Sequence, residues 1–143
     1  MTELTRLLVA NRGEIAVRIA RAARRLGVTT VGVAPEDDRS SPHLDRVDVV
    51  ATLPGRGTAA YLDVDAVVSA AVDHDCDALH PGYGFLAEAA ELAARCADAG
   101  VRFVGPSAES LAVLGDKAAA RRRRARRRLR TLPVRGRGRI RQR

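Results

Sequence analysis

Residues 7–28 read LLVANRGEIAVRIARAARRLGV, and this stretch decides the fold. The apolar run Leu7–Ala10 fits a short buried strand, and a polar turn leads from it directly into an amphipathic segment, Glu14–Leu26. A buried strand that passes straight into a helix is typical of the βαβ unit, so the stretch predicts a parallel sheet with crossover helices. Gly27 follows where a left-handed helix cap belongs, and Gly100 has the same position after a later helix.

The rest of the chain up to residue 120 repeats this alternation of apolar runs and helix-length segments. Residues 36–60 are rich in turn residues, and no internal repeat is visible. The expected strands are Leu7–Ala10, Thr30–Val33, Val47–Ala51, Ala78–His80 and Arg102–Val104. The expected helices are Glu14–Leu26, Val64–Asp73, Glu88–Ala99 and Ala108–Leu114. This pattern predicts an α/β fold with a parallel sheet and flanking helices.

The first expected helix has two distinct faces. An apolar stripe that can pack on the sheet is formed by Ile15, Ile19, Ala22 and Leu26. A neighbouring face carries Arg18, Arg21 and Arg25. These arginines are either a solvated surface or a contact face for an acidic partner or a second subunit.

Charge divides the chain into two unlike parts. Residues 1–120 hold all 17 acidic side chains against 12 basic ones, whereas residues 121–143 hold 13 arginines and no acid. The net charge of +8 therefore describes the last segment and not the domain before it. Aromatic residues make up only 3% of the chain, so platforms for stacking nucleic-acid bases are scarce.

The two cysteines, Cys76 and Cys96, form no C-x-x-C pair. This usage favours neither a disulfide framework nor a zinc site, and it fits a reducing, cytoplasmic setting. The apolar run near the amino terminus is too short for a secretory leader, and no uncharged apolar run approaches the roughly 18–20 residues of a membrane span. We expect a soluble protein without a metal site in this chain.

The first candidate site is the turn Asn11-Arg12-Gly13 between strand and helix. Such a junction points backbone N–H groups and the positive end of the helix dipole into the crevice where open α/β sheets bind ligands. A dinucleotide site would show G-x-G-x-x-G here, but the chain has A-N-R-G-E-I, which argues against NAD or FAD.

The second candidate site lies in residues 77–93, DALHPGYGFLAEAAELA. His80 is expected to end a strand, and a proline and two glycines then form a turn around Tyr83. Tyr83 combines an apolar ring with a polar tip, which suits a ligand contact, whereas Phe85 and Leu86 are expected in the core. Two interpretations of His80 stay open: a ligand-side hydrogen-bonding group, or a buried histidine whose hydrogen bonds are satisfied.

The third candidate lies in residues 101–120, VRFVGPSAESLAVLGDKAAA. Ser107 is expected to cap a short helix, which Gly-Asp-Lys follows. Lys117 is the only lysine beside 24 arginines, and a compact ammonium group can contact a phosphate. The alternative is a lysine without a special task, because an arginine-rich composition makes any lysine rare.

Together these segments resemble the amino-terminal domain of biotin carboxylase, the ATP-dependent component of acetyl-CoA, propionyl-CoA and pyruvate carboxylases. ANRGEIAVRI, HPGYGFLAE and FVGPS…GDKAAA stand in the family's order and at about its spacing, over residues 6–120. The resemblance implies a Rossmann-like, pre-ATP-grasp domain over residues 1–120. It also implies a ligase that makes carboxybiotin from bicarbonate, biotin and MgATP, with bicarbonate activated as carboxyphosphate. An acetyl-CoA carboxylase would belong to fatty acid biosynthesis.

The resemblance also assigns residues. It implies that Lys117 contacts ATP phosphates and that Tyr83 and Gly84 border the biotin pocket, with His80 a further candidate at the same loop. Arg18 and Arg21 would help to form a homodimer interface. The implied partners are a biotin carboxyl carrier protein or domain and a carboxyltransferase.

Some features depart from the family's pattern. Arg25 stands where the family often has an acidic residue, and Ala87-Glu88-Ala89 replaces the usual Ser-Glu-Asn. The family's ATP-grasp domain, with its phosphate loop, magnesium-binding carboxylates and bicarbonate-binding residues, is not in this sequence. A phosphoryl-transfer site without these groups lacks most of its electrostatic stabilisation. We therefore expect this chain alone to be inactive, with no catalytic residue of its own.

Residues 121–143, RRRRARRRLRTLPVRGRGRIRQR, change character abruptly. A shifted reading frame in a GC-rich gene would convert alanine codons into arginine codons and would explain the loss of every acid. The alternative is a functional basic arm, which would make the protein a nucleic-acid-binding protein held through phosphate charge. Under both hypotheses the segment is expected to be disordered, because it has little apolar surface to bury.

Overall fold

The computed structural model describes residues 3–115. Lys117, the predicted boundary at residue 120 and the arginine-rich segment lie outside the described residues. The strands are β1 (Arg6–Val9), β2 (Thr29–Pro35), β3 (Val49–Leu53), β4 (Ala78–His80) and β5 (Arg102–Phe103). The helices are α1 (Gly13–Arg25), α2 (Gly57–Ala60), α3 (Val64–Asp73), α4 (Ala90–Asp98) and α5 (Ala108–Gly115), with short 3₁₀ helices η1 (Glu36–Asp38) and η2 (Leu44–Arg46).

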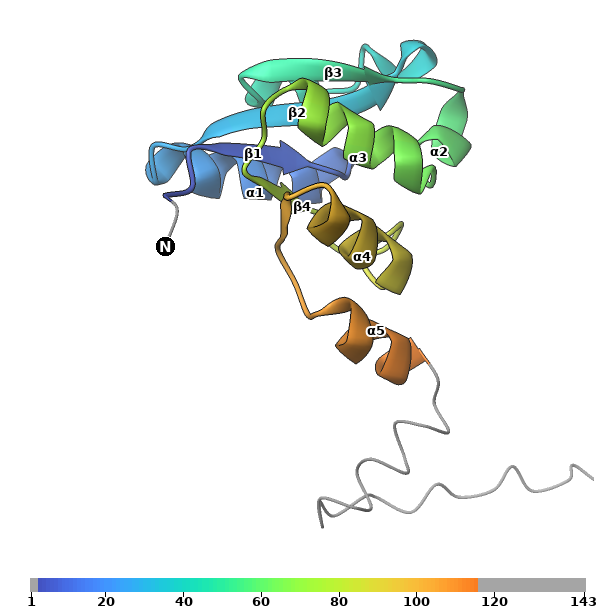
Figure 1. The fold of residues 1–143 in the computed structure, drawn as a ribbon. Coiled ribbons are helices and arrows are strands. Elements are labelled where there is room, and N and C mark those ends of the chain that lie inside the picture. The colour runs from blue at the N-terminus through green and yellow to red at the C-terminus, as the bar shows by residue number, and fades with distance from the viewer. Residues whose placement is uncertain (1–2, 116–143) are drawn as a thin grey trace, which may run out of the picture. The chain divides into compact units, whose positions relative to one another are not determined.

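The described strands form one parallel sheet in the order β3-β2-β1-β4-β5 (Figure 1). β1 lies in the middle, paired with β2 on one side and β4 on the other. The chain therefore leaves β1 toward one half of the sheet and later returns to build the other half. The carboxyl ends of β1 and β4 meet at this reversal of strand order, which is where open α/β sheets form a ligand crevice. The predicted fold class is confirmed.

Two apolar cores cover the two faces of the sheet. Leu8 and Leu79 point to the side covered by α3 and α4, and Val9 and Ala78 point to the side covered by α1. The alternation follows from the two-residue side-chain period of a strand, because both faces of a parallel sheet are buried. Cys76 and Cys96 are free thiols buried in the first of these cores.

The helix boundaries follow the expected chemistry. Gly27 and Gly100 end α1 and α4 with φ of 72° each, in the left-handed region that favours glycine. Ser107 Oγ accepts a hydrogen bond from the Ser110 N–H at 3.2 Å, as predicted for the cap of α5. Residues 3–112 belong to one compact unit, and the last turn of α5, residues 113–115, belongs to a second.

The predicted apolar stripe of the first helix is partly wrong. Ile19 is buried, but Ala22 is exposed and Leu26 is 78% exposed. The buried face of α1 instead uses small side chains, because Ala16, Ala20 and Ala23 let the helix approach the sheet closely. Ala22 and Leu26 line an apolar hollow of about 350 Å³ beside α1. α2 and the two 3₁₀ helices were also not predicted, since they lie in the turn-rich segment.

Candidate functional site

The turn after β1 and the turn after β4 meet at the carboxyl edge of the sheet. The Ala10 N–H donates to the His80 carbonyl at 2.9 Å, which extends the pairing of β1 with β4 to the start of both turns. Beyond this point lies a pocket of about 320 Å³. It is lined by residues 11–15 from one segment and by residues 83–85 from the other. The structure therefore brings the first two predicted motifs together.

Asn11 holds the second turn in place from the first. Its side chain is 2% exposed, and its Nδ2 donates to the Pro81 carbonyl at 2.7 Å and to the Tyr83 carbonyl at 2.9 Å. Its Oδ1 accepts from the Arg12 N–H at 2.8 Å. A buried amide with its donors and acceptor engaged is a rigid connection, because losing either partner would leave a buried polar group unpaired. The sequence singled out the Asn11 turn but not this role.

The backbone of the second turn has an unusual conformation. Gly82 and Gly84 have φ of 68° and 66°, and Phe85, a bulky residue, has φ of 44°. Such a φ is strained for a side chain like that of phenylalanine, and strain of this kind gathers at functional sites because the surrounding structure enforces it. Gly82 also packs so closely on Asn11 that a Cβ would lie 2.8 Å from Nδ2.

Tyr83 projects from this turn and is 60% exposed. Its hydroxyl donates to the carboxylate of Glu14, in the first turn of α1. The hydrogen bond to Glu14 and the charge of that carboxylate raise the pKa of Tyr83 above its ordinary 10.0. The ring of Tyr83 is thus accessible, and its contact with a ligand stays a prediction.

His80 lies on the other side of the same turn. Its Nδ1 is 3.0 Å from the Gly82 N–H and accepts that hydrogen, so the neutral ring carries its own hydrogen on Nε2. Burial lowers the pKa of His80, which favours this neutral form. The ring lines the apolar hollow beside α1 and not the pocket next to Tyr83.

A polar cluster behind the pocket was missed by the sequence analysis. Tyr61 donates from its hydroxyl to Asp38 at 2.7 Å, and the Arg12 guanidinium lies 3.5 Å from the same carboxylate and 5.8 Å from the Tyr61 ring centre. Burial and the Asp38 carboxylate raise the pKa of Tyr61. The Tyr61 and Phe85 rings lie 5.5 Å apart, so the cluster supports the strained residue of the turn.

The predicted interface residues do not line this pocket. Arg18 and Arg21 are exposed on α1, and neither forms an ion pair within residues 3–115. Lys117 lies outside the described residues, so the structure does not place it.

The sequence and fold match a family described as the N-terminal domain of biotin carboxylase, over residues 3–111. The chain belongs to this family. Pyruvate carboxylase 1 of Caenorhabditis elegans is 47% identical over 122 residues, which are 83% of this chain and 10% of that protein. Biotin carboxylase 1 of Bacillus subtilis is 47% identical over 119 residues, which are 82% of this chain and 26% of that protein.

A solved structure gives the same result for the fold. The biotin carboxylase domain dimer of Hydrogenobacter thermophilus 2-oxoglutarate carboxylase, in complex with MgADP, ADP and bicarbonate, is 34% identical with a TM-score of 0.88. The match covers 93% of this chain and 29% of that one. This biotin carboxylase N-terminal domain thus spans 10% to 29% of the length of these three relatives. Neither the family match nor these relatives support the nucleic-acid alternative, and the arginine-rich segment lies beyond residues 3–111, which the family description matches.

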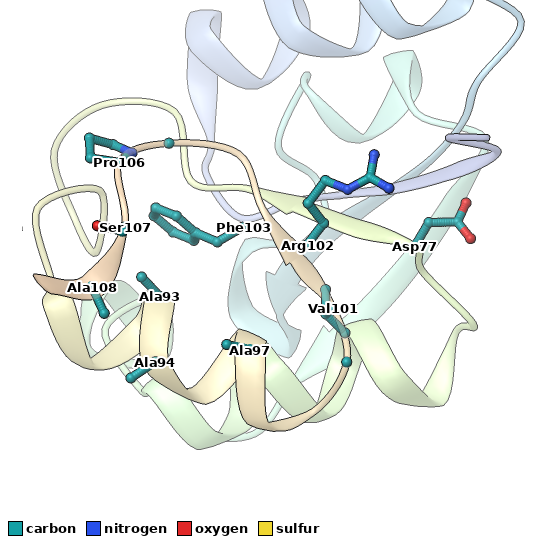
Figure 2. A pocket seen from close by; sticks show the side chains of 12 residues that line it. Asp77, Ala93, Ala94, Ala97, Val101, Arg102, Phe103, Pro106, Ser107 and Ala108 are labelled. Carbon is teal, nitrogen blue, oxygen red and sulfur yellow. The ribbon is translucent and has the colours of Figure 1, made fainter. Parts of the chain in front are cut away.

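A larger hollow in the biotin carboxylase N-terminal domain lies elsewhere. It measures about 710 Å³ and lies between α4 and the segment from β5 to α5. Figure 2 shows that Ala93, Ala94 and Ala97 of α4 line one wall and Phe103 another. Among residues 3–115, none of the predicted site residues lines it. The smaller pocket is the candidate site, because turns from the two central strands converge there.

Two further findings concern the described part of the domain. Within residues 3–115, no group of three or more His, Cys, Asp or Glu side chains could hold a metal ion. No helix in the same range has the length and apolar character needed to cross a membrane.

Proposed function

We propose that this chain supplies the N-terminal part of a biotin carboxylase, an enzyme that carboxylates biotin with bicarbonate and MgATP. The observation that carries the proposal is the turn holding Tyr83 and Gly84, fixed by Asn11 beside the pocket at the reversal of strand order. Membership of the biotin carboxylase N-terminal domain family supports it. The proposal concerns the whole enzyme, of which this chain spans a minor share.

Within this proposal, Tyr83 and Gly84 border the biotin pocket. The exposed phenol ring offers an apolar face and a hydroxyl to a bicyclic ligand, and Gly84 leaves the backbone accessible because it has no side chain. His80 acts on the same turn from behind, since its Nδ1 is engaged by the Gly82 N–H. It remains a candidate for a ligand contact only through Nε2.

Lys117 is proposed to contact the ATP phosphates as a compact positive charge. MgATP supplies the phosphoryl group that activates bicarbonate. The Hydrogenobacter thermophilus relative is in complex with MgADP and bicarbonate, which supports this nucleotide and this substrate for the whole enzyme. We propose that residues outside this chain hold Mg²⁺.

The proposed partners follow from the family. Arg18 and Arg21 are exposed without ion pairs in the described part of the chain, which suits a homodimer interface with acidic groups opposite. A biotin carrier and a carboxyltransferase would complete the reaction, and the carboxyltransferase would choose acetyl-CoA, with a role in fatty acid biosynthesis, propionyl-CoA or pyruvate. Cytoplasmic location and a domain boundary at residue 120 also stay proposals.

A chimera tests the proposed function. Residues 1–120 replace the matching segment of Bacillus subtilis biotin carboxylase 1, and ATP hydrolysis is measured with and without bicarbonate and free biotin. We expect hydrolysis that depends on both. Lys117→Ala should lower kcat/KM for ATP by about 10- to 100-fold, the size of one charged hydrogen bond.

The control variant is Arg46→Ala. Arg46 is an exposed cation whose side chain makes no ion pair within residues 3–115. Its loss should leave the kinetics of the chimera unchanged. A folded chimera whose rate of ATP hydrolysis does not depend on biotin would refute the proposed function.

A further inference from the structure

The turn that carries Tyr83 is held at two points by the segment after β1. One point is on its backbone and the other is at the tip of the Tyr83 ring. The two contacts come from Asn11 and Glu14, about 70 residues earlier in the chain. Asn11 belongs to the first predicted candidate turn, but the sequence analysis assigned no positioning role to Asn11 or to Glu14.

The first contact fixes where the backbone lies. Asn11 Nδ2 spans the turn, because it donates to the carbonyl before Gly82 and to the carbonyl after it. A Cβ at Gly82 would also lie 3.2 Å from Ile15 Cγ1, so the turn is seated on the beginning of α1. Nδ2 donates to the two carbonyls and Oδ1 accepts from the Arg12 N–H, so these hydrogen bonds fix the orientation of the Asn11 side-chain amide.

The second contact fixes where the ring lies. Tyr83 is mostly exposed, so packing leaves its ring largely free and the hydroxyl contact to Glu14 decides its direction. Glu14 and Tyr83 both line the pocket. Arg18, one helical turn after Glu14, lowers the pKa of Tyr83, while Glu14 raises it and has the larger effect. The pKa of Tyr83 thus depends on both charges, which is consistent with a ring held near the start of α1.

We propose that Asn11 and Glu14 are positioning residues for the ligand-facing turn, Asn11 for the backbone of Tyr83 and Glu14 for its ring. The identity of the ligand as biotin rests on the proposed function. The two residues differ in what their loss does. Asn11 is buried and its loss disturbs the fold of the turn, whereas Glu14 is exposed and its loss frees the ring without disturbing the core.

The direct test is a pH titration of the full chain labelled with ¹³Cζ-tyrosine. The chain has two tyrosines, and Tyr83→Phe identifies the signal of Tyr83. Glu14→Ala should lower the pKa of Tyr83 and change its chemical shift at neutral pH. Glu14→Gln keeps an acceptor without the charge and should fall between Glu14→Ala and the parent chain.

The matched control is Glu91→Gln, which changes a first-turn glutamate of α4 that makes no hydrogen bond in the described part of the chain. It should leave the Tyr83 signal unchanged. If Glu14→Ala also leaves the Tyr83 pKa and chemical shift unchanged, the positioning role of Glu14 is wrong.

The chimera separates this inference from the proposed function. There, Glu14→Ala should raise KM for biotin about fivefold, the size of one ordinary hydrogen bond, with kcat little changed, and Glu14→Gln should restore part of the loss. An unchanged KM for biotin in an active chimera would overturn the inference. Suppose instead that ATP hydrolysis by the chimera does not depend on biotin, while Glu14→Ala still lowers the pKa of Tyr83 in the full chain. That result would overturn only the proposed function.

Discussion

Among single residues, the two glycines of the HPGYG turn differ in what surrounds them. Both have positive φ, but a Cβ at Gly82 would lie 2.8 Å from Asn11 Nδ2, whereas a Cβ at Gly84 meets nothing within 4 Å. Gly84→Ala should therefore cost about 1 kcal/mol in the free energy of unfolding, from backbone strain alone. Gly82→Ala should cost about 2–4 kcal/mol, because Asn11 must also move. Urea unfolding measures both, and equal losses would contradict the close packing.

Two aspartates fasten the amino ends of neighbouring strands in the same way. Asp77 Oδ2 accepts from the N–H and hydroxyl of Thr5, both at 2.7 Å, and from the Arg6 N–H at 2.6 Å. Asp48 Oδ2 accepts from the N–H and hydroxyl of Thr30, at 2.8 and 2.7 Å. These hydrogen bonds hold the pKa of both carboxyls below their ordinary 3.8.

The sign of the resulting pH dependence follows from these lowered pKa values. Their stabilising contribution is complete above the unfolded pKa near 3.8 and is lost as pH falls through the folded pKa. Replacing both, Asp48→Asn with Asp77→Asn, should lower stability at pH 7 by about 1 kcal/mol per site and flatten the loss below pH 4. Asp98→Asn, at a carboxylate without a hydrogen bond in the described part, is the control. The measurement is the free energy of unfolding of each variant from pH 7 to pH 2. If the double variant loses stability with falling pH as steeply as the parent chain, the two carboxylate contacts are wrong.

At the scale of elements, α1 packs through small residues. Ile19 is 7% exposed and Leu26 is 78% exposed, although the apolar spacing treats them alike. Ile19→Ala should cost about 2–4 kcal/mol in unfolding free energy, while Leu26→Ala should cost less than about 0.5 kcal/mol. Thermal or urea unfolding of the two variants checks this. Similar losses would mean that Leu26 is buried in solution.

Most of the elements could be predicted from sequence because they depend on local signals, although β3 begins at Val49 instead of Val47 and α4 at Ala90 instead of Glu88. α3 was predicted with its observed bounds, and the left-handed caps at Gly27 and Gly100 follow from glycine's freedom at positive φ. The face of α1 could not be predicted, because alanines pack on the sheet as well as larger residues where the helix comes close. α2 has four residues, too few for a periodic pattern.

The site was predictable only in part, because some of its residues act through local sequence signals and others through long-range contacts. Tyr83 and Gly84 stood out because their turn concentrates glycine and proline. The roles of Asn11 and Glu14 depend on contacts with residues about 70 positions away, which no local pattern encodes. The sequence offered one signal for Asn11, which is its position as a polar residue directly after the apolar run Leu7–Ala10.

At the scale of the whole molecule, the site depends on the sheet order. β1 and β4 are far apart in sequence, and their pairing brings the two motifs to one edge. The chain belongs to a family whose named relatives are several times longer. The turns after β1 and β4 line the proposed pocket from this domain, and the inactivity of the chain alone stays a prediction.

The central claim is that Asn11 joins the two motifs into one site. The most direct measurement is NMR detection of scalar coupling across hydrogen bonds, from the Asn11 side-chain nitrogen to backbone carbonyl carbons. We predict couplings to Pro81 and Tyr83, together with slow exchange of the Asn11 side-chain hydrogens, since their hydrogen bonds are 2.7 and 2.9 Å long. An Asn11 side chain without couplings, whose hydrogens exchange freely with water, would contradict the account.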